Sequence, residues 1–202
     1  IWIMHPVINK IVKYVSMGDQ DRVFNSVTDA IDEYGILALD QIIAPTLRII
    51  GDSTSSGILS VGHEHLASEA IRAALFSFKR SDDHVSSRLA ANNTKRVLTG
   101  ALAGDFHDLA THMVRAWCEL NGVKCLVVGA NTPVSIFLEL VELHDIQVVA
   151  VTISEGHSTA VKIGEVIDDL LTSLPSGCCL AVGGSAASSL EGRHPNLNVV
   201  AS

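Results

Sequence analysis

The stretch Val97-Leu98-Thr99-Gly100-Ala101-Leu102 decides the fold, because it is the first of several short apolar runs that alternate with helical patterns. Further apolar runs lie at 123–128, 148–153, 178–182 and 199–200, and helical patterns lie near 107–121, 133–144, 157–172 and 185–191. Strands that alternate with helices predict βαβ units and a parallel sheet. With right-handed crossovers, five such strands predict a doubly wound parallel sheet, flavodoxin-like or Rossmann-like, which binds ligands beyond the carboxyl ends of its strands.

The chain before this stretch carries helical patterns only, from about residue 5 to residue 92. Pro6 suits a first helical turn, and Gly18-Asp19 indicates a stop followed by a new cap. Gly35 is expected to end the second helix, and a third is expected from about Leu37 to Ile50. This half of the chain therefore predicts several short, connected helices.

A polar segment, Gly51–Gly57, is expected to form a loop or a frayed turn. Ser60 then caps a helix that runs from Val61 to about Lys79. Short connections between four helices predict an antiparallel bundle. The expected organisation is a four-helix-bundle cap over residues 1–88 and a Rossmann-like domain over 89–202, with the linker near Ser86 to Lys95.

The composition excludes several classes of function for this segment. The chain has 202 residues, a net charge of −8 and no apolar stretch long enough for a membrane helix. The charge argues against nucleic-acid binding through phosphates, so any DNA-binding domain is expected outside this segment. No basic segment precedes an apolar run at the first residues, and none of the four cysteines forms a Cys-x-x-Cys pair. A cytoplasmic protein with small, buried, reduced cysteines is expected.

The first βα loop, Gly104 to Ala110, carries the candidate metal ligand. A neutral imidazole at His107 can bind a metal, and the carboxylate of Asp105 can fix its tautomer. Read alone, the loop also fits a helix-capping aspartate beside a solvated histidine. A closed protein metal site would need several ligands, so a single histidine fits a metal whose other ligands belong to a macrocycle.

Two further strand ends contribute small residues to the same edge. The third strand ends at Val151-Thr152-Ile153-Ser154, and the fourth runs into Gly183-Gly184. Paired glycines let a ligand approach the backbone closely, although an ordinary βα turn often contains glycine as well. The sequence has neither GxGxxG nor a P-loop lysine, so nucleotide binding is poorly supported.

Together these three sites resemble the cobalamin-binding signature of methionine synthase, corrinoid methyl carriers and light-responsive regulators. That signature is Asp-x-His-x-x-Gly, then Ser-x-Leu, then Gly-Gly. Here the blocks read Asp105-Phe106-His107-Asp108-Leu109-Ala110, Thr152-Ile153-Ser154 and Gly183-Gly184, at the spacing of that family. The preceding helices, with Gly18-Asp19, Pro45, Gly51 and Glu64-His65, look like the cap domain of the family.

The resemblance implies a role for each block. His107 would be the lower axial ligand of cobalt, and Asp105 would orient its far nitrogen. Thr152 stands where a serine meets the nucleotide tail, Ser154 replaces leucine and makes that wall more polar, and Gly183-Gly184 would pass the tail. Ala110 replaces the glycine of the motif, and its added methyl group is expected to crowd the corrin or to shift it slightly.

The cap also resembles the CarH/LitR-type photoreceptors, in which a Glu-His pair lies near the upper face of adenosylcobalamin. Glu64 and His65 match that pair, although both also fit a solvated helix face. Ten positions before the glutamate those proteins have a tryptophan, where this chain has Thr54, followed by Ser55 in place of a histidine. A larger, more polar upper chamber is implied. Three alternatives follow for this chamber. His63 or His65 could occupy the upper side, the site could accept several upper ligands, or a second chromophore such as a bilin could bind there.

The leading hypothesis is a cobalamin-dependent photosensory domain in transcription regulation, not an enzyme. Light would remove the upper cobalt ligand and change the cap and its interface. The partners would be a second copy or an attached output domain. The first alternative is a corrinoid methyl carrier of a methyltransferase system. Methyl carriers usually continue the first block as His-Asp-Ile-Gly-Lys-Asn, whereas Ala110-Thr111-His112 lack the lysine and the asparagine. The second alternative is a bilin or haem sensor on the same fold.

Overall fold

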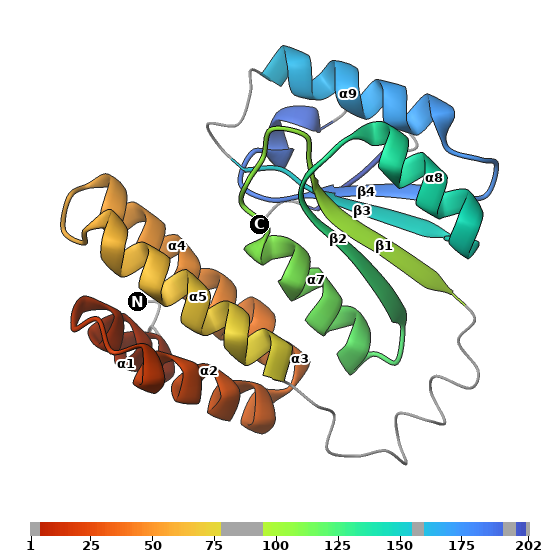
Figure 1. The fold of residues 1–202 in the computed structure, drawn as a ribbon. Helices are drawn as coiled ribbons and strands as arrows, with labels where there is room; N and C mark the ends of the chain where they lie inside the picture. Colours follow the sequence, from red (N-terminus) through yellow and green to blue (C-terminus); the bar gives the residue numbers. More distant parts are fainter. Residues whose placement is uncertain (1–4, 78–94, 155–159, 192–196, 201–202) are drawn as a thin grey trace. The chain divides into compact units, whose positions relative to one another are not determined.

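The computed structural model describes residues 5–77, 95–154, 160–191 and 197–200. The chain divides into two compact units, Ile1–Ser81 and Asp82–Ser202, which we call the helical unit and the sheet unit (Figure 1). The predicted domain boundary between residues 88 and 89 lies outside the described residues, as does the predicted linker up to residue 94.

In its described residues, 5–77, the helical unit has four helical rods. They are α1 (Pro6–Ser16), α2 (Gln20–Tyr34), a continuous rod made of α3 (Ile36–Ala38), the π-helical η1 (Leu39–Ile43) and α4 (Ala44–Ser55), and finally α5 (Val61–Ser77). The predicted four-helix architecture is confirmed.

Local capping explains where the helices of this unit begin. The Asp19 carboxylate accepts a hydrogen bond from the backbone N–H of Arg22 at 3.1 Å and caps α2. Gly35, at φ +57°, ends α2 in a conformation that suits glycine. The Ser60 hydroxyl accepts from the backbone N–H of His63 at 3.2 Å, as expected for the cap of α5.

The third rod contains one π-helical turn, which the sequence analysis did not anticipate. The N–H of Ala44 donates to the carbonyl of Leu39, five residues earlier. The next residue, Pro45, has no N–H to continue the α-helical ladder. Insertion of a π turn beside a proline re-satisfies the neighbouring backbone groups.

The predicted loop over Gly51–Gly57 was wrong for its first five residues, because α4 continues to Ser55. The helix stops where a residue can take a positive φ, at Gly57 (φ +75°), and not where the apolar stripe ends. Beyond it the N–H groups of Ile58 and Leu59 donate to the Ser53 carbonyl at 2.8 and 3.0 Å. Polar residues in a helix interior cost little when water still reaches them, so composition alone misplaced the end.

The apolar faces of these helices form one core. Its buried members come from α1, α2, the third rod, the 56–60 connection and α5: Ile8, Ile11, Val15, Val23, Val27, Ala30, Ile31, Ala38, Leu39, Ile42, Ile43, Ile50, Leu59, Ala67, Ala70, Ile71, Ala74 and Leu75. Burial of this face is what holds four short helices together.

The sheet unit is a five-stranded parallel sheet, as predicted, and its strand order is β2-β1-β3-β4-β5. Its strands are β1 (Arg96–Leu102), β2 (Lys124–Thr132), β3 (Val148–Thr152), β4 (Cys179–Gly183) and β5 (Leu197–Val200). Helix α7 (Leu109–Leu120) covers one face, and α8 (Val134–His144) and α9 (Ala160–Ser173) cover the other (Figure 1). Strand β1 lies between β2 and β3, so the chain runs from β1 outward to β2 and then returns past β1 to β3. The direction of the strand order therefore reverses at β1, which is the switch point of the sheet.

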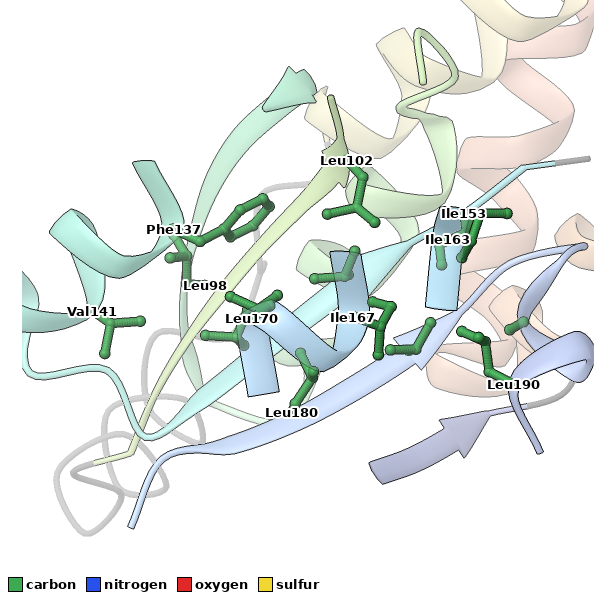
Figure 2. Close-up of a cluster of buried hydrophobic side chains, with 14 of the residues drawn as sticks. Leu98, Leu102, Phe137, Val141, Ile153, Ile163, Ile167, Leu170, Leu180 and Leu190 are labelled. Atoms are coloured by element: carbon green, nitrogen blue, oxygen red, sulfur yellow. The ribbon is translucent and has the colours of Figure 1, made fainter. Parts of the chain in front are cut away.

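The main core of this unit lies between the sheet and the α8–α9 face (Figure 2). Leu98 and Leu102 of β1 pack there with Phe137 of α8 and with Ile167 and Leu170 of α9. Since side chains alternate along a strand, the neighbouring residues of β1 lie on the α7 face. The core pattern thus fixes which residues can reach which side.

Two predicted element boundaries differ from the structure. Strand β2 extends four residues beyond the predicted end at 128, with register shifts against β1. The helix expected near 185–191 is a single 3-10 turn, Ala187–Leu190. Only Ala187 and Leu190 of that turn are fully buried, so its apolar pattern is too short to support an α-helix. Among the described helices, none combines the length and the apolar character that a membrane span requires.

Candidate functional site at the end of strand β1

The loop between β1 and α7 lies at the carboxyl end of β1, the strand between β2 and β3. It turns immediately: the N–H of Asp105 donates to the Leu102 carbonyl at 2.9 Å, and Gly104 takes φ +90°. Asp108 then precedes the first helical residue, Leu109. The loop therefore presents residues 105–108 at the position where switch-point ligands bind.

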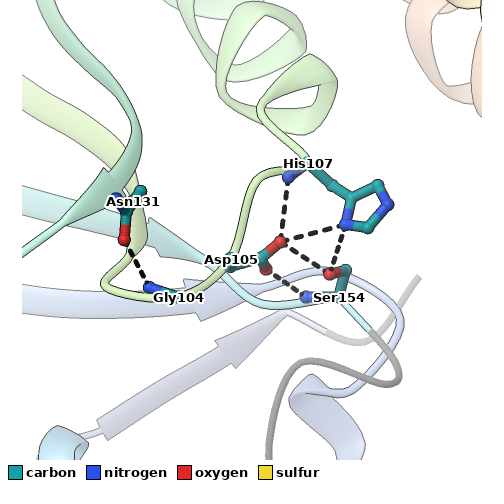
Figure 3. A network of polar contacts seen from close by, with 5 residues as sticks. All are labelled: Gly104, Asp105, His107, Asn131 and Ser154. Atoms are coloured by element: carbon teal, nitrogen blue, oxygen red, sulfur yellow. Dashed lines mark hydrogen bonds and ion pairs between the residues drawn. The ribbon is translucent and has the colours of Figure 1, made fainter.

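Asp105 is the centre of a hydrogen-bond network (Figure 3). Its carboxylate, 1% exposed, accepts from the Ser154 N–H and the Ser154 hydroxyl, both at 2.7 Å. It also accepts from the His107 N–H at 3.0 Å and lies 3.2 Å from His107 Nδ1. Residues 47 to 49 positions apart are thus joined at the ends of two adjacent strands.

These hydrogen bonds set the charge of the network. Burial alone would raise the pKa of Asp105, but the donors from His107 and Ser154 together lower it below its ordinary value. Asp105 is therefore ionised at neutral pH and can only accept hydrogen bonds.

The charge of Asp105 assigns the tautomer of His107. For the Nδ1 contact to be a hydrogen bond, the ring must carry its proton on Nδ1. The Ser154 oxygen, 3.1 Å from the same nitrogen, is a second acceptor, while its own proton points to Asp105. In the neutral ring Nε2 then carries the lone pair, on a side chain that is 76% exposed. This is an imidazole prepared to bind a metal.

The remaining sheet-unit candidates surround this network. Phe106 is 71% exposed. The Asp108 carboxylate lies 3.5 Å from His112 Nε2, one turn along α7. Thr152 pairs in register with Ala101 on one side and Gly183 on the other, and alternation with the buried Val151 places it on the α7 face.

The Thr152 side chain is 4% exposed, and its hydroxyl has no hydrogen-bond partner among the described residues. The hydroxyl of Thr99, fully buried on β1, also has no hydrogen-bond partner among the described residues. Buried hydroxyls are normally paired, so each marks a place where a partner is missing.

The two glycines after β4 differ in what the protein itself demands. At Gly184, with φ +103°, an added Cβ would overlap the backbone of Ile153. At Gly183 an added Cβ would lie 3.7 Å from the Val200 carbonyl, an ordinary contact. The fold therefore requires glycine at position 184. At position 183 the fold would accept a small side chain, so the glycine there has another reason.

The helical-unit candidates stand on two helices. Thr54 lies in the last turn of α4, and its buried hydroxyl has no partner among the described residues. Glu64 lies in the first turn of α5, and His65, the next residue, is exposed. The structure thus brings Asp105, His107 and Ser154 into direct contact, and places Thr54, Glu64 and His65 in the other unit.

Sequence reasoning missed two contributors. Ser154 was expected only as a polar wall, whereas it bonds both Asp105 and His107. Asn131, at the end of β2, was not singled out, yet its side-chain oxygen accepts from the Gly104 N–H at 2.7 Å (Figure 3). An asparagine between a strand and a Thr-Pro turn was the available signal, since asparagine tolerates positive φ.

Within the ranges that the structure describes, no three His, Cys, Asp or Glu side chains are grouped to hold an ion. A metal whose other ligands belong to a macrocycle is compatible with a single histidine ligand.

Comparisons with known proteins give a family match over part of the chain and a likeness in fold. The family model described as "B12 binding domain" matches residues 7–77, which span α1 to α5. The monomethylamine corrinoid protein of Methanosarcina barkeri has a similar structure, with a TM-score of 0.66 at 15% identity over 98% of this chain and 92% of that chain. This likeness establishes the fold of a helical cap followed by a Rossmann-like sheet.

Two further solved structures are less similar. A cobalamin-binding protein from Desulfitobacterium hafniense DCB-2 gives a TM-score of 0.43 at 18% identity, over 94% of this chain and 91% of that chain. The methanol:cobalamin methyltransferase complex of Methanosarcina barkeri gives 0.45 at 18% identity, over 98% and 76%. No curated protein matches the sequence.

Proposed function

We propose that this chain binds cobalamin, with His107 as the lower axial ligand of the cobalt. The observation that carries the proposal is the network in which Asp105 and Ser154 take up His107 Nδ1 and leave Nε2 with a lone pair. The match of residues 7–77 to the B12 binding domain supports it from the other unit.

The residues near the network fit a corrinoid with a nucleotide tail. The Thr152 hydroxyl lacks a partner among the described residues, and a heterocyclic base in the tail can supply one. Gly183 lies beside Thr152 in the register, and its missing side chain leaves room that the fold does not itself require. We assign Thr152, Gly183 and Gly184 to the tail, and Phe106, Asp108 and Leu109 to the loop beneath the corrin.

Each polar residue has a defined task in this arrangement. His107 would hold the metal, Asp105 would keep the proton on Nδ1, and Ser154 would hold both in place. Bound cobalamin would supply a cobalt–carbon bond that light or a methyltransferase can break. The ionised Asp105 also compensates part of the positive charge that ligation places on the ring.

The finer role that we propose is photosensory regulation with adenosylcobalamin. Its support is Glu64 and His65 on α5, together with the departure from the methyl-carrier pattern at Ala110-Thr111-His112. Thr54 adds a buried hydroxyl without a partner in the described chain, which suits a polar upper ligand or a second chromophore such as a bilin. The output would pass to a second copy or to an attached domain.

A corrinoid methyl carrier is the second candidate. The fold likeness to the monomethylamine corrinoid protein favours it. In that role a partner methyltransferase would recognise the bound corrinoid, and light would have no physiological effect.

The test is reconstitution of the protein with adenosylcobalamin in the dark, followed by illumination. We expect binding in the dark, a lasting change in the absorption spectrum and in hydrodynamic size after light, and loss of the change in His107→Ala. His144→Ala, a histidine of α8, is the matched control and should behave as wild type.

The outcomes separate the candidates. Failure to bind any cobalamin in the dark contradicts the whole proposal. Binding without a lasting light response, together with methylation by a methyltransferase, replaces the sensor with the carrier. Spectral uptake of bilin or haem alone replaces both with a tetrapyrrole sensor.

A further inference from the structure

Asn131 links the end of β2 to the loop that carries His107. Its side-chain oxygen accepts from the Gly104 N–H at 2.7 Å, and its own N–H donates to the Asp105 carbonyl at 2.8 Å. The two hydrogen bonds clasp consecutive residues of the loop across 26 to 27 positions of sequence. Figure 3 shows the hydrogen bond between Asn131 and Gly104 beside the network of Asp105.

The conformation of Asn131 is specific to this contact. Its φ is +53°, a left-handed conformation that asparagine adopts more readily than other residues with a side chain. Gly104, which donates to it, is itself at φ +90°. Both partners therefore take backbone conformations that few residues tolerate, and these conformations bring the amide oxygen to the loop.

The clasp completes the fixation of Asp105. The Asp105 N–H is held by the Leu102 carbonyl, its carbonyl by Asn131, and its carboxylate by Ser154 and His107. Without the Asn131 side chain, the Gly104 N–H loses its partner on β2, while the backbone N–H of residue 131 can still donate to the Asp105 carbonyl. The carboxylate that orients His107 would then be anchored on one fewer side.

We propose that Asn131 is a positioning residue, which holds the Gly104–Asp105 backbone so that His107 can ligate cobalt, and which thereby sets the share of bound corrinoid ligated by the protein. This inference rests on the proposed function. The competing state is corrinoid bound with its own tail base, or with no nitrogen, on the lower side of the metal.

The experiment uses the full chain labelled with ¹⁵N-histidine, loaded with Co(II) cobalamin of natural isotopic abundance and measured by electron paramagnetic resonance. Ligation by His107 splits the cobalt lines into two, ligation by the tail base splits them into three, and absence of a nitrogen leaves them unsplit. The spectrum therefore reports the share of each state directly.

Three variants separate the side-chain contact from the backbone conformation. Asn131→Asp keeps an acceptor and tolerates positive φ, so it should give the wild-type ratio. Asn131→Gly tolerates positive φ but removes the acceptor, and should lower the ratio of histidine-ligated to other states about fivefold, the effect of one ordinary hydrogen bond. Asn131→Ala should lower the ratio at least as much and also lower the melting temperature.

A two-line spectrum in Asn131→Gly as strong as in wild type would overturn the role of Asn131 and leave His107 as the ligand. A wild-type spectrum without the two-line pattern would overturn the ligation by His107 and this inference with it. A melting temperature for Asn131→Gly within a few degrees of wild type shows that a change in ratio comes from positioning.

Discussion

The two units of this chain carry different kinds of information. The helical unit contains the match to the B12 binding domain, but its candidate residues Thr54, Glu64 and His65 form no hydrogen-bond network among the described residues. The sheet unit lies outside that match, yet its candidates Asp105, His107 and Ser154 form a closed network. The likeness to a known family thus comes from the helices, while the side chains suited to metal binding lie at the strand ends.

The contrast predicts that substitutions at Asp105, His107 or Ser154 affect the folded protein without any ligand, whereas substitutions at Glu64 and His65 do not. Asp105, His107 and Ser154 already form hydrogen bonds with one another. The candidate residues in the helical unit would form polar contacts only when a ligand is present. The following tests run from the largest expected effect to the smallest.

Gly184→Ala should cost about 3 kcal/mol of unfolding free energy, because positive φ and overlap with the Ile153 backbone act together. The matched control is Gly177→Ala, where φ is +94° but no atom lies within 4 Å of an added Cβ. It should cost only about 1 kcal/mol. Urea unfolding of the two variants measures the difference, and equal losses would show that overlap does not matter.

Asp105→Asn should lower stability by about 2 kcal/mol at pH 6, because the amide cannot accept all the hydrogen bonds of the carboxylate. The pKa of Asp105 is lowered in the folded state, so its contribution is full above its unfolded pKa of about 3.9 and is lost as the pH falls through the folded value. The deficit of the variant should therefore shrink between pH 5 and pH 2. A deficit that is independent of pH would contradict the ionised network.

Thr152→Val removes a hydroxyl that has no partner among the described residues, so the protein without ligand should keep its stability or gain about 1 kcal/mol. Affinity for cobalamin should fall about fivefold, while affinity for cobinamide, which lacks the nucleotide tail, should not change. Isothermal titration with both corrinoids measures this. An equal loss for both would remove the tail from this position.

Glu64→Gln and His65→Gln should change stability by less than about 0.5 kcal/mol, because the polar ends of both side chains have no hydrogen bond among the described residues. Their effect should appear only in the rate or extent of the light response. A large loss of stability in the protein without ligand would show that these residues support the fold of the helical unit.

Much of the fold followed from sequence because it depends on periodicity. Apolar runs such as Val148–Thr152 and the caps at Asp19 and Ser60 are local signals, and the structure has each of them. The predicted end of α4 was wrong because the helix ends at the turn formed by Gly57, whereas the polar composition alone predicted an earlier end.

The site was only partly predictable for a related reason. His107 and Asp105 lie two residues apart, so their contact can be expected from the loop alone. Ser154 and Asn131 reach the loop from other strands, and their roles depend on register and on one positive φ. Sequence spacing placed these strand ends at one edge, but it did not determine which side chains would bond.

The most direct test of the central claim is the electron paramagnetic resonance spectrum of Co(II) cobalamin bound to protein labelled with ¹⁵N-histidine. The account predicts cobalt lines split into two in wild type and loss of that splitting in His107→Ala, with His144→Ala unchanged. Lines split into three in wild type, from the cofactor's own base, or a two-line pattern that survives in His107→Ala, would contradict it.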